Sequence, residues 1–167
     1  AERACTRFDR GLKEGFREVG VDLRLEGVVV IVGSYGSGKS EVAVNLAVHH
    51  RQAGLQVRIA DLDLVNPYFR SREAEAQLTD LGVEVVLPPR PLVQSELPVL
   101  SPLVGGLIRR SEGLIILDAG GDNVGATVLA ALGDAFAGRR CQLLQVINPW
   151  RPDTSTVEGC IALLRRI

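Results

Sequence analysis

The sequence predicts an α/β fold of three layers (α/β/α), in which a mainly parallel sheet lies between two layers of helices. Short apolar runs of strand length alternate with longer helical segments along most of the chain. The apolar runs lack polar alternation, which is typical of strands that are buried on both faces of a parallel sheet. No internal repeat or low-complexity linker interrupts this order. We therefore expect one α/β unit with helices on both faces of its sheet.

Composition limits the function classes. The chain has 167 residues, 46% hydrophobic and 23% charged, with a formal net charge of −1. This balance gives no overall field that would attract nucleic acid or an anionic membrane. Three widely spaced cysteines without a Cys-x-x-Cys pair argue against a disulfide framework or a zinc site. No apolar run is long enough to span a membrane or to form a signal peptide, so we expect a cytoplasmic protein.

Residues 1–26 are predicted to form a helical and extended segment that precedes the α/β domain. The domain itself is predicted to cover residues 27–167. Within 1–26, four apolar residues share one helical face, so we expect a short amphipathic helix over about 5–19. This helix either packs on the body of the protein or docks a partner. The alternating residues 21–26 suggest an edge strand or an extended segment.

The first predicted strand leads into a glycine-rich loop. Five β-branched residues from Val28 to Val32 precede Gly-x-x-x-x-Gly-Lys-Ser, and a helical segment follows. This is the P-loop pattern in the context that it requires. Its glycines let successive N–H groups converge on phosphate oxygens at a helix N-terminus. The predicted nucleotide-binding residues are Gly33, Ser34, Tyr35, Gly36, Ser37, Gly38, Lys39, Ser40, Glu41 and Gly121.

Two side chains of this loop have specific expected roles. Lys39 would reach the β- and γ-phosphates, and the Ser40 hydroxyl would bind Mg²⁺. The chain contains only two lysines, Lys13 and Lys39, so it uses arginine almost everywhere else. The flexible ammonium of a lysine suits a phosphate in this position better than the rigid, planar guanidinium of an arginine. The helix that follows runs to about residue 53. We expect His49 and His50 near its end as surface residues or as residues at the C-terminal end of the helix dipole, not as metal ligands.

Acidic residues follow the second predicted strand, residues 57–61. Asp61 and Asp63 lie at its carboxyl end, where open α/β sheets bind ligands. There they would lie beside Mg²⁺ and the γ-phosphate; capping a helix or a turn is the alternative for each. A helix over 72–81 and a third strand over 83–87 come next.

The fourth predicted strand, residues 113–118, ends in Asp118 and is followed by two glycines. An apolar strand that ends in aspartate fits the second phosphate-site element, in which Asp118 holds Mg²⁺ through water. Gly121 would let the loop approach the γ-phosphate and move when it leaves. A helix from Asp122 to about residue 137, a fifth strand over 142–147 and a last helix capped by Asp153 or Thr154 complete the chain.

Four of these segments together resemble the MinD/ParA-type P-loop ATPases, the group of CobQ/CobB/MinD/ParA nucleotide-binding domains that includes nitrogenase iron protein. The resemblance covers roughly 27–167. It is carried by residues 33–47, by Asp61-Leu62-Asp63, by residues 117–121 and by Val146-Ile147-Asn148-Pro149.

The resemblance implies a Mg²⁺-dependent ATPase that couples its ATP or ADP state to a protein partner or to a homodimer. It implies that Asp118 lies near the metal and that Asp61 or Asp63 positions the attacking water, with Asp63 also close to Mg²⁺. The alternative is an ATP-dependent ligase or amidotransferase domain similar to cobyrinic acid a,c-diamide synthase. For this alternative, no pocket for a substrate carboxylate is visible in the sequence. A small-molecule kinase ranks lowest, because no arginine-rich segment lies between the fourth and fifth predicted strands. A binding module without turnover is a further alternative.

Two departures from the group matter. Ser34 stands where many members carry a second lysine that crosses a dimer, although Arg151 or Arg70 could take its place. The group also continues with a further strand and an adenine-reading asparagine, so by this resemblance the C-terminal strands lie beyond Ile167. The residues Asn148-Pro149-Trp150-Arg151 do not fit Asn-Lys-x-Asp, which disfavours a GTPase.

Overall fold

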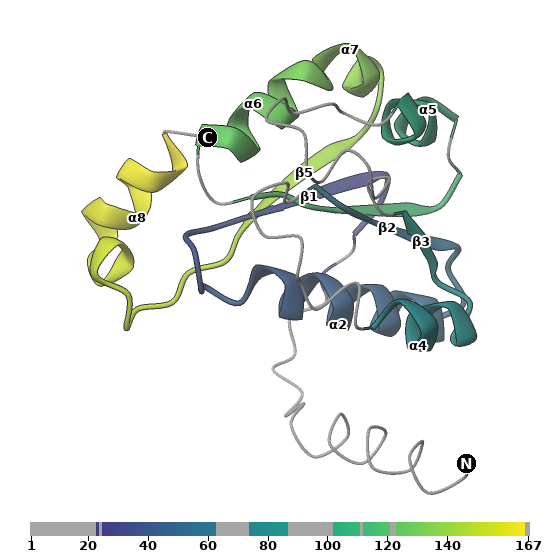
Figure 1. Ribbon diagram of the computed structural model, residues 1–167, viewed down its shortest axis with the longest axis horizontal. Coiled ribbons are helices and arrows are strands. Elements are labelled where there is room, and N and C mark those ends of the chain that lie inside the picture. Colours follow the sequence, from purple (N-terminus) through teal and green to yellow (C-terminus); the bar gives the residue numbers. More distant parts are fainter. Residues whose placement is uncertain are drawn as a thin grey trace, which may run out of the picture.

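A five-stranded, all-parallel sheet forms the centre of the protein (Figure 1). The computed structural model describes residues 23, 25–62, 74–86, 102–110, 112–120 and 123–165. Within these residues the strand order is β3-β2-β4-β1-β5. The strands are β1 (Val28–Val32), β2 (Val57–Asp61), β3 (Glu84–Val86), β4 (Leu114–Asp118) and β5 (Cys141–Gln145). The predicted α/β fold with a parallel sheet is confirmed.

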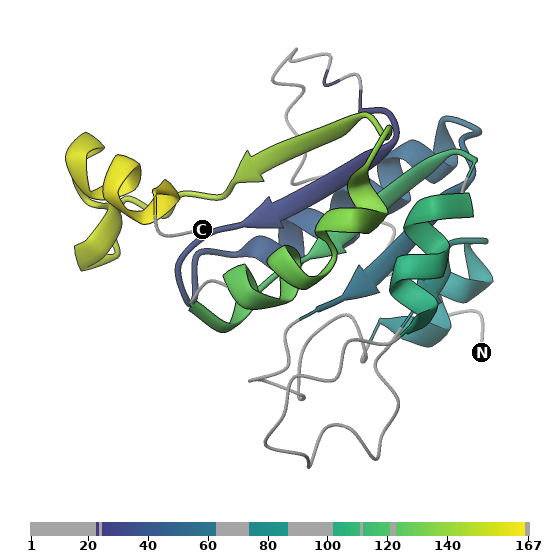
Figure 2. The same ribbon diagram turned by 90° about the horizontal axis from the view of Figure 1, so that it is seen from above.

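Helices cover both faces of this sheet, so the fold has three layers. One face carries α2 (Lys39–Gln52) and α4 (Glu75–Asp80) (Figure 1). The other carries α5 (Pro102–Arg110), α6 (Asn123–Ala131) and α7 (Gly133–Phe136). The 3₁₀ turn η2 (Pro152–Thr154) and α8 (Val157–Leu164) lie beyond the end of β5, apart from both layers (Figure 2). No described helix is long and apolar enough to cross a membrane.

The two central strands explain the uninterrupted apolar runs in the sequence. Every residue of β1 and β4 is buried, because helices pack on both faces. Alternate side chains enter opposite sides of the core. Ile31 and Ile116 belong to the cluster under α2, whereas Val30 and Leu117 belong to the cluster under α5 to α7. This alternation also determines which face the last residue of each strand occupies.

Some boundaries differ from the sequence predictions. The expected single helix up to residue 137 is interrupted at Leu132, whose N–H donates to the carbonyl of Leu129, and Gly133 follows it. Glycine is a poor residue for a helix interior, which accounts for a break there. The predicted N-terminal helix lies outside the described residues.

The predicted caps of the last helix, Asp153 and Thr154, are wrong. The residue that caps α8 is Thr156, whose side-chain oxygen accepts a hydrogen bond from the N–H of Gly159 at 3.1 Å. Thr154 does not cap α8 because the helix begins only at Val157. The Thr154 hydroxyl donates to the carbonyl of Asn148 at 2.7 Å. It closes the preceding turn instead.

His49 and His50 both lie in the last turn of α2, where basic residues face the C-terminal end of the helix dipole, as one of the two predictions for them stated. Only one of the two is at the surface. His49 is exposed, but the side chain of His50 is only 8% exposed at the C-terminal end of α2. Burial, and then the neighbouring His49, lower the pKa of His50 from the ordinary value of 6.5. The folded protein therefore binds a proton at His50 less readily than the unfolded chain does.

This burial predicts a pH dependence of stability. The free energy of unfolding should fall as the pH drops below about 6.5, because the unfolded chain takes up the proton at His50 first. Replacing His50 with glutamine should reduce this loss, which urea unfolding at pH 7.5 and at pH 5.5 would measure. His49→Gln should reduce this loss less than His50→Gln does, because it removes only the smaller of the two causes of the lowered pKa of His50. The same loss of stability in wild type and His50→Gln would contradict the prediction.

Candidate functional site

The loop between β1 and α2 depends on its glycines. Gly36 and Gly38 have φ values of 68° and 97°, in the left-handed region that favours glycine. A Cβ on Gly33 would run into the carbonyl oxygen of Val146. Gly38 precedes α2, and no side chain caps this helix. The first N–H groups of a helix have no carbonyl within the helix to bind, so those at the start of α2 can donate to a bound group.

Several polar groups in the loop are buried without being fully used. Lys39 is 7% exposed, and its Nζ donates to the carbonyl of Ser34 at 3.3 Å. The hydroxyl oxygens of Ser34 and Ser37 are buried, and neither has a hydrogen-bond partner among the described residues. Buried polar groups normally find partners, and leaving them without one is costly. A buried ammonium and unused hydroxyls beside a helix N-terminus fit an anionic group such as phosphate.

Three strand ends meet at this loop. Asp61 and Asp118 occupy paired positions at the carboxyl ends of β2 and β4, and each is 1% exposed. The N–H of Ala119 donates to the carbonyl of Ile31 at 3.0 Å, which holds the end of β4 beside the end of β1. By the alternation of the strands, both aspartates lie on the α2 face of the sheet, as Ile116 does.

Ser40 and Asp118 are in direct contact. The Ser40 hydroxyl donates to Oδ2 of Asp118 and joins the first turn of α2 to the end of β4. Hydroxyl and carboxylate oxygens are the ligands that Mg²⁺ takes, together with waters and substrate phosphates. The described part of the chain contains no group of three His, Cys, Asp or Glu side chains that could hold a metal alone. A cation here would therefore need oxygens from a ligand or from water.

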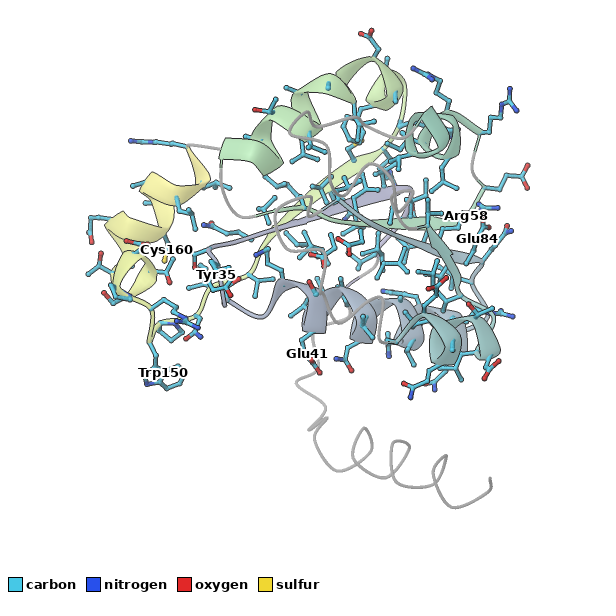
Figure 3. All side chains as sticks on the ribbon, in the orientation of Figure 1. Tyr35, Glu41, Arg58, Glu84, Trp150 and Cys160 are labelled. Atoms are coloured by element: carbon cyan, nitrogen blue, oxygen red, sulfur yellow. The ribbon has the colours of Figure 1, made fainter. Side chains whose placement is uncertain are left out.

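The structure does not bring every predicted site residue together. The side chain of Glu41 points outward from α2, and its carboxylate lies 3.4 Å from the Asn45 amide nitrogen, Nδ2 (Figure 3). Tyr35 is 74% exposed on the loop (Figure 3). Asp63 and Gly121 lie outside the described residues, so their predicted roles stay predictions.

No sequence pattern predicts that Arg151 lies beside the glycine loop. The guanidinium of Arg151, which follows β5, occupies the space that a side chain at Gly36 would fill. Sequence reasoning named Arg151 only as a possible replacement for a lysine at Ser34. Its place beside Gly36 depends on the pairing of β1 with β5, which the sequence pattern does not reveal.

Comparison with solved structures finds a protein with a similar fold. The chain is similar to the crystal structure of the signal recognition particle receptor FtsY from Elizabethkingia anophelis, with a TM-score of 0.53 and 20% sequence identity. The match covers 93% of this chain and 50% of that chain, so this chain spans about half the length of the receptor. No protein-family model matches the sequence, and no curated protein matches it.

These findings define the class of protein at the level of the fold. The chain has the α/β fold of the P-loop nucleoside triphosphatases. Similarity at 20% identity shows the fold alone, and it does not separate the MinD/ParA-type group from other branches.

Proposed function

We propose that this protein binds ATP together with Mg²⁺ and hydrolyses it as a molecular switch of the MinD/ParA-like class. The observation that carries the proposal is the contact between Ser40 and Asp118, with the ammonium of Lys39 buried in the loop beside it. This arrangement supports a site for a triphosphate and a divalent cation. The nucleotide state would be read by a protein partner or by a second copy of the chain.

The chain's own groups would supply most of the chemistry. Phosphoryl transfer to water requires positioning and charge neutralisation. The N–H groups of residues 36–40 and the ammonium of Lys39 would hold the β- and γ-phosphates. Ser40 would bind Mg²⁺ directly and Asp118 would hold it through water, and the bound ion would neutralise phosphate charge. Asp61, next to Asp118 at the strand ends, would orient the attacking water, a role that Asp63 shares as a candidate.

The switch would work through the segments that follow the two aspartates in the sequence. A γ-phosphate that contacts residues after Asp61 and Asp118 orders them, and its loss releases them. Gly121, which follows Asp118 closely, suits a backbone that must approach the phosphate. Such loops would change the affinity for a partner between the ATP and ADP states.

Calorimetric titration tests the proposal. We expect ATP to bind in the presence of Mg²⁺ and AMP to show no binding, because the loop holds the β- and γ-phosphates. GTP should bind more weakly than ATP, because residues 148–151 do not match the Asn-Lys-x-Asp pattern. Phosphate release should then be measured alone, with a small carboxylate, and with a candidate partner. Turnover that requires the carboxylate would favour the ligase or amidotransferase alternative. If neither triphosphate binds, the proposed function is wrong.

A further inference from the structure

The segment that follows β5 lies directly against the glycine loop. The N–H of Val146 donates to the carbonyl of Val32 at 2.7 Å. The pairing of β1 with β5 therefore extends to Val32, the last residue of β1, which is followed directly by the loop. The carbonyl of Val146 in turn lies so close to Gly33 that no side chain fits there. Side chains from the turn after β5 are therefore neighbours of any group bound in the loop.

Hydrogen bonds fix the backbone of this turn on both sides of Arg151. Its N–H donates to the carbonyl of Asn148 at 3.0 Å, and its carbonyl accepts from the N–H of Thr154 at 3.1 Å. The side-chain oxygen of Asn148 also accepts from the N–H of Trp150 at 3.0 Å. Thr154, which closes the turn, is only 2% exposed. The position from which the Arg151 side chain extends is thus well defined.

The guanidinium of Arg151 has a neighbour in the loop but no counter-charge among the residues that the structure describes. It lies against Gly36, whose positive φ and missing side chain leave the room that it occupies. No carboxylate among the described residues forms an ion pair with it; the pairs in that part of the chain join Arg58 to Glu84 and Arg140 to Glu26. The guanidinium of this exposed residue therefore lies against the loop at Gly36 without an ion pair in the described part of the chain.

We propose that Arg151 binds the phosphate chain of the nucleotide, an inference that rests on the proposed function. A guanidinium presents several N–H donors in a plane and binds phosphate oxygens in pairs. Arg151 adds a second positive charge to that of Lys39, beside a loop in which Ser34 is neutral. Both cations come from one chain, so neutralising the phosphates does not require a lysine from a second copy.

The test compares substitutions at Arg151 with one at a matched arginine. Arg151→Ala removes the guanidinium, whereas Arg151→Lys keeps the positive charge but loses the planar set of N–H donors. Arg110→Ala is the control and removes an exposed arginine at the end of α5. Each variant is titrated with ATP and with inorganic tripolyphosphate, both with Mg²⁺. Tripolyphosphate has no base or sugar, so it reports on the phosphate contact alone. Thermal unfolding of each variant checks that the fold is intact.

We expect Arg151→Ala to weaken both ligands about tenfold or more, the usual effect of losing a charge-assisted hydrogen-bond pair. Arg151→Lys should recover part of the affinity, and Arg110→Ala should leave it unchanged. Unchanged tripolyphosphate binding in Arg151→Ala overturns the inference, even if ATP binding falls, because the guanidinium would then contact the base. An equal loss in Arg110→Ala overturns it as well, because the effect would be general charge. If wild type binds neither ligand, the proposed function itself fails, and this inference fails with it.

Discussion

Replacing Lys39 with alanine is expected to abolish nucleotide binding and turnover. Lys39 is 7% exposed. Among the described residues, its ammonium donates a hydrogen bond to the carbonyl oxygen of Ser34, at 3.3 Å. A bound triphosphate would take this ammonium as its nearest fixed positive charge. Removing it leaves the phosphates without that charge in a poorly solvated position, where electrostatic interactions are strongest.

Two further variants make this result specific. Lys39→Arg keeps the positive charge but replaces a compact ammonium with a larger planar group, and we expect it to restore little activity. Lys13→Ala removes the other lysine of the chain and should behave as wild type. Binding is measured by calorimetry and turnover by phosphate release. Undiminished ATP hydrolysis in Lys39→Ala would refute the assignment of the loop.

Replacing Asp118 with asparagine is expected to lower Mg²⁺-dependent hydrolysis by about tenfold to a hundredfold. The change keeps the shape of the side chain and an oxygen that can accept from the Ser40 hydroxyl, so the link between α2 and β4 should survive. It removes the negative charge that would hold the hydrated metal ion. We therefore expect ATP affinity to lose most of its dependence on Mg²⁺.

The control for this prediction is Glu112→Gln, which neutralises an exposed carboxylate just before β4. It should leave both hydrolysis and its Mg²⁺ dependence unchanged. ATP affinity is measured at several Mg²⁺ concentrations in wild type and in both variants. A Mg²⁺ dependence in Asp118→Asn equal to that of wild type would show that Asp118 does not hold the metal.

Much of the fold could be predicted because local chemistry decides it. The β-branched run from Val28 to Val32 and the apolar run that ends at Asp118 are buried strands in the structure, as expected. The glycine loop and the start of α2 at Lys39 also agree with the prediction. In each case, a short stretch of sequence contains the determining interactions.

The order of the strands depends on long-range contacts and could not be predicted in this way. Asp61 and Asp118 are far apart in the sequence, and only the register of β2 with β4 makes them neighbours. The same is true of Arg151, which reaches Gly36 through the pairing of β5 with β1. The cap of α8 was predicted too early for a different reason: the 3₁₀ turn Pro152–Thr154 comes first, so the helix begins only at Val157.

The turn that carries Arg151 also carries the single tryptophan of the chain, Trp150, which is 89% exposed and points away from the body of the protein (Figure 3). The indole emission of the protein therefore comes entirely from one site beside the glycine loop. In water this emission is red-shifted and open to quenching by iodide. A partner that covers the turn would shift the emission to the blue and protect it from the quencher, so the native sequence already contains an optical probe of docking at this end of the sheet.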